Sequence, residues 1–104
     1  MEKEKKVLAR KHWISFGAKP KGIVVVDNGA KQALLKGGKS LLLPGVVAWE
    51  GHFKKDDVIV VRDEERHEIA RGITNYSTTM LQAIEEKKGQ RELIHCNNLV
   101  LCER

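Results

Sequence analysis

The chain has few of the residues that stabilise small secreted proteins, and it has no long apolar run. Its 104 residues include only two cysteines, Cys96 and Cys102, whereas a disulfide-stabilised secreted domain of this size would need more. The longest fully apolar runs are a few residues, far short of the roughly 20 that cross a membrane, and no signal peptide is recognisable. We therefore expect a soluble cytoplasmic protein with no membrane partner.

Metal ligands and catalytic pairs are also scarce. The four histidines lie in separate segments and share no i, i+4 spacing; they are His12, His52, His67 and His95. A zinc site would need His or Cys ligands close together. His95 does adjoin Cys96, but neighbouring residues of a strand point to opposite faces of the sheet and make no nucleophile pair. The sequence therefore predicts no metal, no cofactor and no catalytic residue.

One phosphate-binding motif is incomplete. Gly38-Lys39-Ser40 matches the end of a Walker A loop, but the first glycine of that motif would have to stand where the chain has Ala33. A Walker loop also follows a strand and begins a helix, whereas this segment follows an expected helix. Two readings stay open for the double glycine: it ends the helix, or it lets a ligand approach the backbone.

What the chain does have is positive charge, concentrated in its first half. The net charge is +5 and the pI is about 9.4, and charged residues counted along the sequence give +5 for 1–22, +3 for 23–55 and −3 for 56–104. A basic surface favours polyanions such as nucleic acids, because neutralising phosphates releases counterions. The alternative is that the charge serves solubility alone.

The proline turn at residues 19–22 divides the chain into two parts. Proline restricts its own backbone and that of the residue before it. We expect residues 1–21 to form a basic amphipathic lead-in or hinge segment, with Trp13 buried against the domain that follows. Residues 22–104 then form one domain, since a chain of this length has room for a single core.

The first half of that domain shows a strand followed by a helix. A β-branched run at 23–26 predicts a buried strand. Asp27 or Asn28 then caps a helix with apolar residues at i, i+3 and i+4, and Gly37 ends it. The Leu-Leu-Leu-Pro-Gly segment at 41–45 predicts a turn.

The second half is mainly strands, predicted at 46–50, 58–62, 67–73 and 99–101. The acidic tip 63–65 is expected to be a solvated hairpin turn, and Gly72 predicts a bulge or a close backbone approach. Ser77 or Thr78 caps a second helix, which ends at Gly89. Its apolar stripe is Met80, Leu81 and Ile84. Trp49 is expected to pack in the core and Tyr76 to lie at a polar rim.

Three segments in a fixed order, 22–30, 34–47 and 69–77, together resemble the PUA domain, a family named for pseudouridine synthases and archaeosine transglycosylases. More narrowly, residues 10–22 and 92–101 are similar to the hinge and the end of the C-terminal PUA domain in the glutamate 5-kinase family. The resemblance covers about residues 10–102. It implies a mainly β fold with short helices: a PUA-type pseudobarrel of about six strands and two to three helices.

The resemblance also implies a noncatalytic RNA-binding module that contacts structured RNA, such as a tRNA-like stem. Binding would use the first helix, the glycine-rich loop and a later strand. The positions that match are Lys31, Lys36, Gly37, Gly38, Lys39, Ser40, Leu43, Pro44, Gly45, Arg71 and Gly72. In glutamate 5-kinase the domain is an accessory one, so the alternative is an accessory or regulatory domain that contacts a kinase domain or another protein. The kinase domain is absent from this chain, and no enzyme activity is expected.

Overall fold

A computed structural model describes residues 13–14, 19–37, 39–83 and 92–101. In the described parts the chain forms seven β-strands, two α-helices and two short 3-10 helices. In order these are β1 (Gly22–Val26), α2 (Asn28–Leu35), β2 (Leu41–Leu42), η2 (Leu43–Gly45), β3 (Val46–Gly51), β4 (Val58–Arg62), β5 (Glu68–Ile73), α3 (Thr78–Ala83), β6 (Glu92–Ile94), η3 (Cys96–Asn98) and β7 (Leu99–Leu101).

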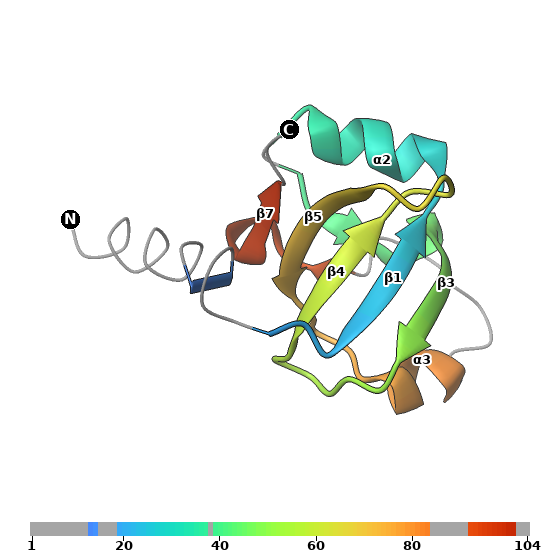
Figure 1. Ribbon diagram of the computed structural model, residues 1–104, viewed down its shortest axis with the longest axis vertical. Helices are drawn as coiled ribbons and strands as arrows, with labels where there is room; N and C mark the ends of the chain where they lie inside the picture. The colour runs from blue at the N-terminus through green and yellow to red at the C-terminus, as the bar shows by residue number, and fades with distance from the viewer. Residues whose placement is uncertain (1–12, 15–18, 38, 84–91, 102–104) are drawn as a thin grey trace.

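The strands form two sheets, and the described strands do not close into one barrel. Five of them make a sheet in the order β3-β1-β4-β5-β7, and β2 pairs with β6. Neighbours are antiparallel except β1 and β4, which run parallel. Helix α2 lies across one end of the larger sheet and α3 lies at the other end (Figure 1). The expected mainly β fold with short helices is confirmed. Helix α2 lies at the same end of the larger sheet as the turn between β4 and β5.

The core lies on one face of the larger sheet. Strand β1 alternates as a half-buried strand should, with Val24 and Val26 fully buried. Strand β4 contributes Ile59 and Val61 to the same cluster. Helix α2 buries a single side chain, Leu34. Ala30 is partly buried and also packs against the core cluster, and polar contacts hold the start of the helix.

Both ends of α2 agree with the sequence prediction. The Asp27 side chain caps the helix by accepting a hydrogen bond of 2.8 Å from the Ala30 backbone N–H. The helix ends at Leu35 with Lys36 as its C-cap, and Gly37 follows with a φ of +81°, in the left-handed region that favours glycine. Gly37 therefore lets the chain turn after the helix, and no side chain covers the backbone at this position.

Two short strands were not predicted. Strand β2 lies in the segment expected to be a turn, and it pairs with β6, about 50 residues further along the chain, through Leu41 and Ile94. Both of these side chains are fully buried. Strands of two and three residues are too short to show a period, so their pairing depends on a contact that local sequence does not carry.

Predictions for single apolar residues were partly wrong. Trp13 is 49% exposed and Met80 is 43% exposed, whereas the neighbours Ile14 and Leu81 are the buried ones. Leu81 was part of the predicted stripe and is buried as expected, so the prediction for this helix was wrong for Met80 alone among its described residues. Trp49 packs against the core as expected. The predicted helix residues Ile84 and Gly89 lie outside the described residues.

Tyr76 is the third correction. It was expected at a polar rim, but the ring is half-buried and packs against the core cluster. Its backbone is held by Thr74, whose hydroxyl donates to the Tyr76 carbonyl and accepts from the Tyr76 N–H. A tyrosine has a polar end and an apolar body, so it can lie at a polar rim or pack against a core. Tyr76 packs against the core.

Candidate nucleic-acid interface

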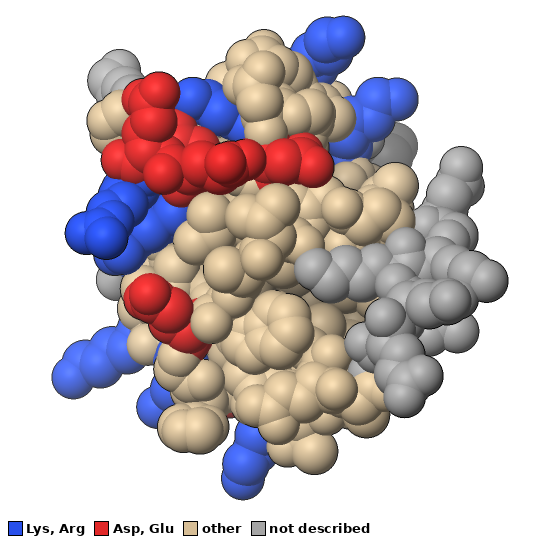
Figure 2. Space-filling view, turned by 90° about the vertical axis from the view of Figure 1, so that its right-hand side faces the viewer, with Lys and Arg blue, Asp and Glu red and all other residues tan. Residues whose placement is uncertain are grey.

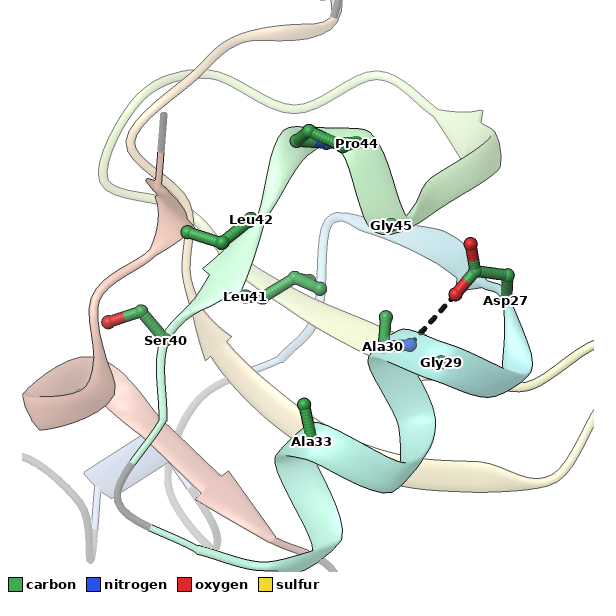
Figure 3. Close-up of a pocket in the computed structure, with 9 residues that line it drawn as sticks. All are labelled: Asp27, Gly29, Ala30, Ala33, Ser40, Leu41, Leu42, Pro44 and Gly45. Atoms are coloured by element: carbon green, nitrogen blue, oxygen red, sulfur yellow. Dashed lines mark hydrogen bonds between the residues drawn. The ribbon is translucent and has the colours of Figure 1, made fainter. Parts of the chain in front are cut away.

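A groove of about 280 Å³ lies between α2 and the β2–η2 segment (Figure 3). Its α2 wall is made of small residues, Gly29, Ala30 and Ala33, which keep the helix surface low. Its other wall comes from the segment that the sequence predicted as a turn. The remaining lining residues are Asp27, Ser40, Leu41, Leu42, Pro44 and Gly45. Asp27 is thus the one lining residue with a charged side chain.

The groove is narrow at the end where α2 begins. There the backbone of Gly45 touches the helix, since a Cβ placed on Gly45 would lie 2.5 Å from the Ala30 Cβ. The Asp27 N–H donates to the Gly45 carbonyl at 2.9 Å and fastens the two walls together. A side chain at position 45 would therefore push the walls apart.

The groove is wide at the end where α2 finishes, between Ala33 and Ser40 (Figure 3). The turn that follows α2 is open: nothing lies within 4 Å of a Cβ placed on Gly37. Lys36 and Lys39 flank that turn with exposed side chains, and neither forms an ion pair with any residue that the structure describes. Ser40 is fixed, because its hydroxyl oxygen accepts from the Cys96 N–H at 2.9 Å.

Lys31, predicted as an RNA contact, holds an acidic side chain instead. Its ammonium lies 2.8 Å from the Asp63 carboxylate. Asp63 was expected in a solvated turn, but its side chain is only 5% exposed and its Oδ1 accepts from the backbone N–H groups of Glu65 and His67. The prediction of a solvated turn was wrong for Asp63 and right for Glu64 and Glu65, which are exposed.

Electrostatics at Asp63 favour its charged form. The hydrogen bond from Lys31 holds the pKa of the Asp63 carboxyl well below its usual value of 3.8, and the backbone donors of the turn act in the same direction. Desolvation of the carboxyl opposes them without reversing the shift. This ion pair fastens the start of α2 to the turn between β4 and β5.

Negative charge therefore gathers beside the start of α2. A second, shallow hollow there is lined by Asn28, Lys31, Asp63, Glu64 and Glu65. Figure 2 shows acidic side chains in a band across the upper part of the molecule, above a broad uncharged surface. The start of the helix is thus bordered by carboxylates, while its far end carries the exposed lysines.

The other predicted contacts fall into two groups. Pro44 and Gly45 line the groove, whereas Leu43 is fully buried in the core. Gly38 lies outside the described residues. The predicted RNA contacts did not include Gly29, Ala30 and Ala33. Their signal was the run of small residues on one side of the predicted helix, which is compatible with a wall that faces a ligand.

Arg71 and Gly72 do not line the groove. Gly72 is buried, and a Cβ placed on it would lie 2.6 Å from Ile94 and 2.8 Å from the Asn98 carbonyl. The close approach predicted at this glycine is real, but the chain itself makes it, and the bulge between β4 and β5 lies at Val61 and Arg62. Arg71 forms an ion pair with Glu68.

Comparison of the sequence with models of known protein families agrees with the fold. The model of the PUA domain matches residues 22–95, from the start of β1 to the turn after β6. The chain belongs to the PUA domain family. The groove and its lysines lie inside the matched segment, so they are features of this PUA domain.

Curated relatives point to one enzyme. The chain is 46% identical to a glutamate 5-kinase of Dictyoglomus turgidum over 97% of its own length, and 40% identical to one of a Thermoanaerobacter species. It spans about 30% of the length of these relatives, and the matched part is C-terminal. The similarity is therefore to the part of glutamate 5-kinase that is not the kinase domain.

Solved structures show the same fold. A PUA domain from Aeropyrum pernix K1, solved as a tartrate complex, is 34% identical, covers 82% of this chain and 48% of that one, and has a TM-score of 0.63. A conserved PUA domain protein from Thermoplasma acidophilum is 27% identical, covers 84% and 56%, and has a TM-score of 0.58. Among the residues described here, no cluster of metal-ligating side chains and no helix able to span a membrane is found.

Proposed function

We propose that this PUA domain is a noncatalytic RNA-binding module that holds structured RNA, such as a tRNA-like stem, along α2 and the turn that follows it. In this proposal residues 22–104 are the cytoplasmic binding domain and residues 1–21 a basic segment before it. The observation that carries the proposal is the pair Lys36 and Lys39, exposed beside an open glycine turn at the wide mouth of a groove.

The chemistry of this end suits an RNA backbone. Lys36 and Lys39, which form no ion pair with any described residue, supply charge for phosphates, and phosphate binding by them releases counterions. Gly37 leaves the main chain uncovered between them, so a sugar-phosphate strand can approach closely. The groove behind the turn offers mainly apolar walls, with the charged Asp27 at its other end. Such a surface combines a charged edge for the backbone with an apolar recess for a nucleoside.

The test is the double variant Lys36→Glu/Lys39→Glu, measured by salt-titrated binding to total transfer RNA. Loss of two phosphate contacts should weaken affinity by about tenfold to a hundredfold at 50 to 100 mM salt. It should also lower the slope of log affinity against log salt by about 2. Both lysines are exposed, so the melting temperature should not change.

A matched control is Lys54→Glu/Lys55→Glu, which makes the same charge change in the turn before β4. Both side chains are exposed, and the hydrogen bonds between Lys54 and Asp57 use the backbone N–H and carbonyl of Lys54. The control should lose clearly less affinity than the Lys36/Lys39 variant. Equal losses would mean that net charge alone drives binding, and unchanged binding by the Lys36/Lys39 variant would reject this surface.

A second function is favoured by the identity to glutamate 5-kinase: an accessory or regulatory domain that acts through protein contacts. The observation behind it is that the similarity extends over 97% of the chain. Mixing the chain with a glutamate 5-kinase that lacks its C-terminal part tests this directly. Binding between the two at micromolar concentration, together with no measurable affinity for RNA, would replace the first proposal with this one.

A further inference from the structure

The face of the larger sheet that points away from the core is apolar along β1. This strand turns Val24 and Val26 into the core, and the alternation of a strand places Ile23 and Val25 on the opposite face. Both of these outer side chains are only partly buried. A sheet face in contact with water normally carries polar residues at such positions. Strand β1 therefore has the composition of a strand that is covered on both faces, whereas the core covers one.

A hollow of about 470 Å³ lies on this outer face, where β1 begins. The strand pairings set its floor: Ile23 pairs with Glu50 of β3 on one side and with Val60 of β4 on the other. Arg62 follows two residues along β4 and lies on the same face. The remaining lining residues are Pro20, Lys21, Gly22 and Gly51. In Figure 1 no helix or strand of the described chain lies in front of β1 and β4, so the hollow is open to a partner.

The hollow has a carboxylate on one side of Ile23 and a guanidinium on the other. Glu50 is exposed on β3, and Arg62 is partly buried on β4. Neither forms an ion pair with any residue that the structure describes. Arg71, which lies beside Val60 on β5, is by contrast ion-paired with Glu68. A partner that carries both an acidic and a basic group would therefore match this surface.

A second copy of the same surface carries the matching charges. In a symmetric dimer whose two sheets face each other, the two-fold axis lies between the faces. An axis that runs close to β1 exchanges the β3 side with the β4 side, because these two strands flank β1. Glu50 of each copy then lies over β4 of the other copy, beside Arg62. One symmetric contact thus gives two ion pairs around an apolar centre made by Ile23 and Val60.

We propose that this hollow is an interface at which two copies of the chain associate through the outer faces of β3, β1 and β4. The two Glu50–Arg62 pairs orient the copies, and burial of Ile23 and Val25 supplies the attraction. The hollow lies at the start of β1, whereas α2 follows the end of that strand, so association leaves the groove beside α2 accessible. The association does not depend on RNA binding.

Sedimentation equilibrium of the chain without RNA measures the association directly. A shallow contact of this kind is expected to be weak, with a monomer–dimer dissociation constant of about 10 to 100 µM. A chain that stays monomeric up to about 1 mM would overturn the proposal, including the case in which a different protein covers this face.

Charge reversal distinguishes this interface from any other. Glu50→Arg and Arg62→Glu each bring like charges together at two places, so each variant alone should dimerise at least about tenfold more weakly. An equimolar mixture of the two variants should recover close to the wild-type affinity, because their reversed charges are complementary and both ion pairs form again. Lys36→Glu is the matched control for the change in charge. It lies beyond the end of α2 and should keep the wild-type dissociation constant.

Thermal unfolding verifies that each variant is folded. Glu50 is exposed, so Glu50→Arg keeps the test valid even where Arg62→Glu does not fold. Dimerisation that is unchanged in Glu50→Arg would show that the copies meet at another surface. Two folded variants that fail to complement each other in the mixture would likewise overturn the Glu50–Arg62 pairing.

Discussion

The two ends of helix α2 use the same residue type for opposite purposes. At its first turn Lys31 is ion-paired with the buried Asp63, and the pair fastens the helix to the β4–β5 turn. Beyond its last turn Lys36 and Lys39 are exposed and make no ion pair with the described residues. A lysine on a predicted helix is thus a candidate phosphate contact only when no carboxylate from another element reaches it. The lysine at the start of the helix therefore stabilises the fold, and the lysines beyond its end are free of ion pairs with the described residues.

The largest effect is expected from reversing the charge at each end of α2 separately. Lys31→Glu would place a second carboxylate against Asp63, which then lacks its partner. We expect the melting temperature to fall by about 10 °C. Lys36→Glu should shift it by less than about 2 °C, since exposed charges contribute little. Thermal unfolding at pH 7 measures both, and similar shifts for the two variants would contradict the division drawn here.

Low pH should weaken the Lys31–Asp63 ion pair at the start of α2, because it protonates Asp63. The pKa of Asp63 is lowered in the folded state, so its contribution is present above the unfolded pKa of about 3.8 and is lost as the pH falls below it. Asp63→Asn should therefore be less stable than the wild type at pH 7. The difference should shrink steadily between pH 4 and pH 2 in urea titrations. A gap that stays constant over this range would show that the charge on Asp63 is not what stabilises α2.

The smallest effect is expected from the backbone at the open end. Gly37→Ala should cost about 1 kcal/mol, because alanine is strained at a φ of +81° while its Cβ meets open space. Gly37→Asn should cost less, since asparagine tolerates the left-handed region. Urea unfolding distinguishes the two variants. Equal stability of all three chains would indicate that the turn does not need a glycine.

Most of the regular elements were predictable from local patterns. The run at 23–26, the cap at Asp27 and the stop at Gly37 each carry a signal within a few residues, and β3, β4, β5 and β7 follow from apolar runs between turns. Strands β2 and β6 carry no such signal, because each is defined by its partner about 50 residues away. Local sequence therefore predicts the elements, and it does not predict pairings of this kind.

The candidate site was predicted less well, for a physical reason. A glycine in the sequence does not reveal whether the space beside its backbone is open or is filled by another part of the chain. At Gly37 the space is open, while at Gly72 it is filled by Ile94 and the Asn98 carbonyl. Likewise Lys31 and Lys36 look alike in sequence, and only Asp63, 32 residues further along the chain, separates them. The lysine-flanked turn was predictable, but the groove beside it depends on the contact between Gly45 and Ala30, which local sequence does not show.

The parallel pairing of β1 with β4 constrains the order in which the molecule assembles. The antiparallel pair of β4 and β5 joins segments that follow each other directly, whereas β1 must wait for strands on both sides of it, β3 and β4, that are more distant in sequence. Closing such long loops is slow relative to forming a hairpin. We therefore expect the β4–β5 hairpin to form before β1 joins the sheet, so that the turn holding Asp63 is in place when α2, which follows β1, docks on it.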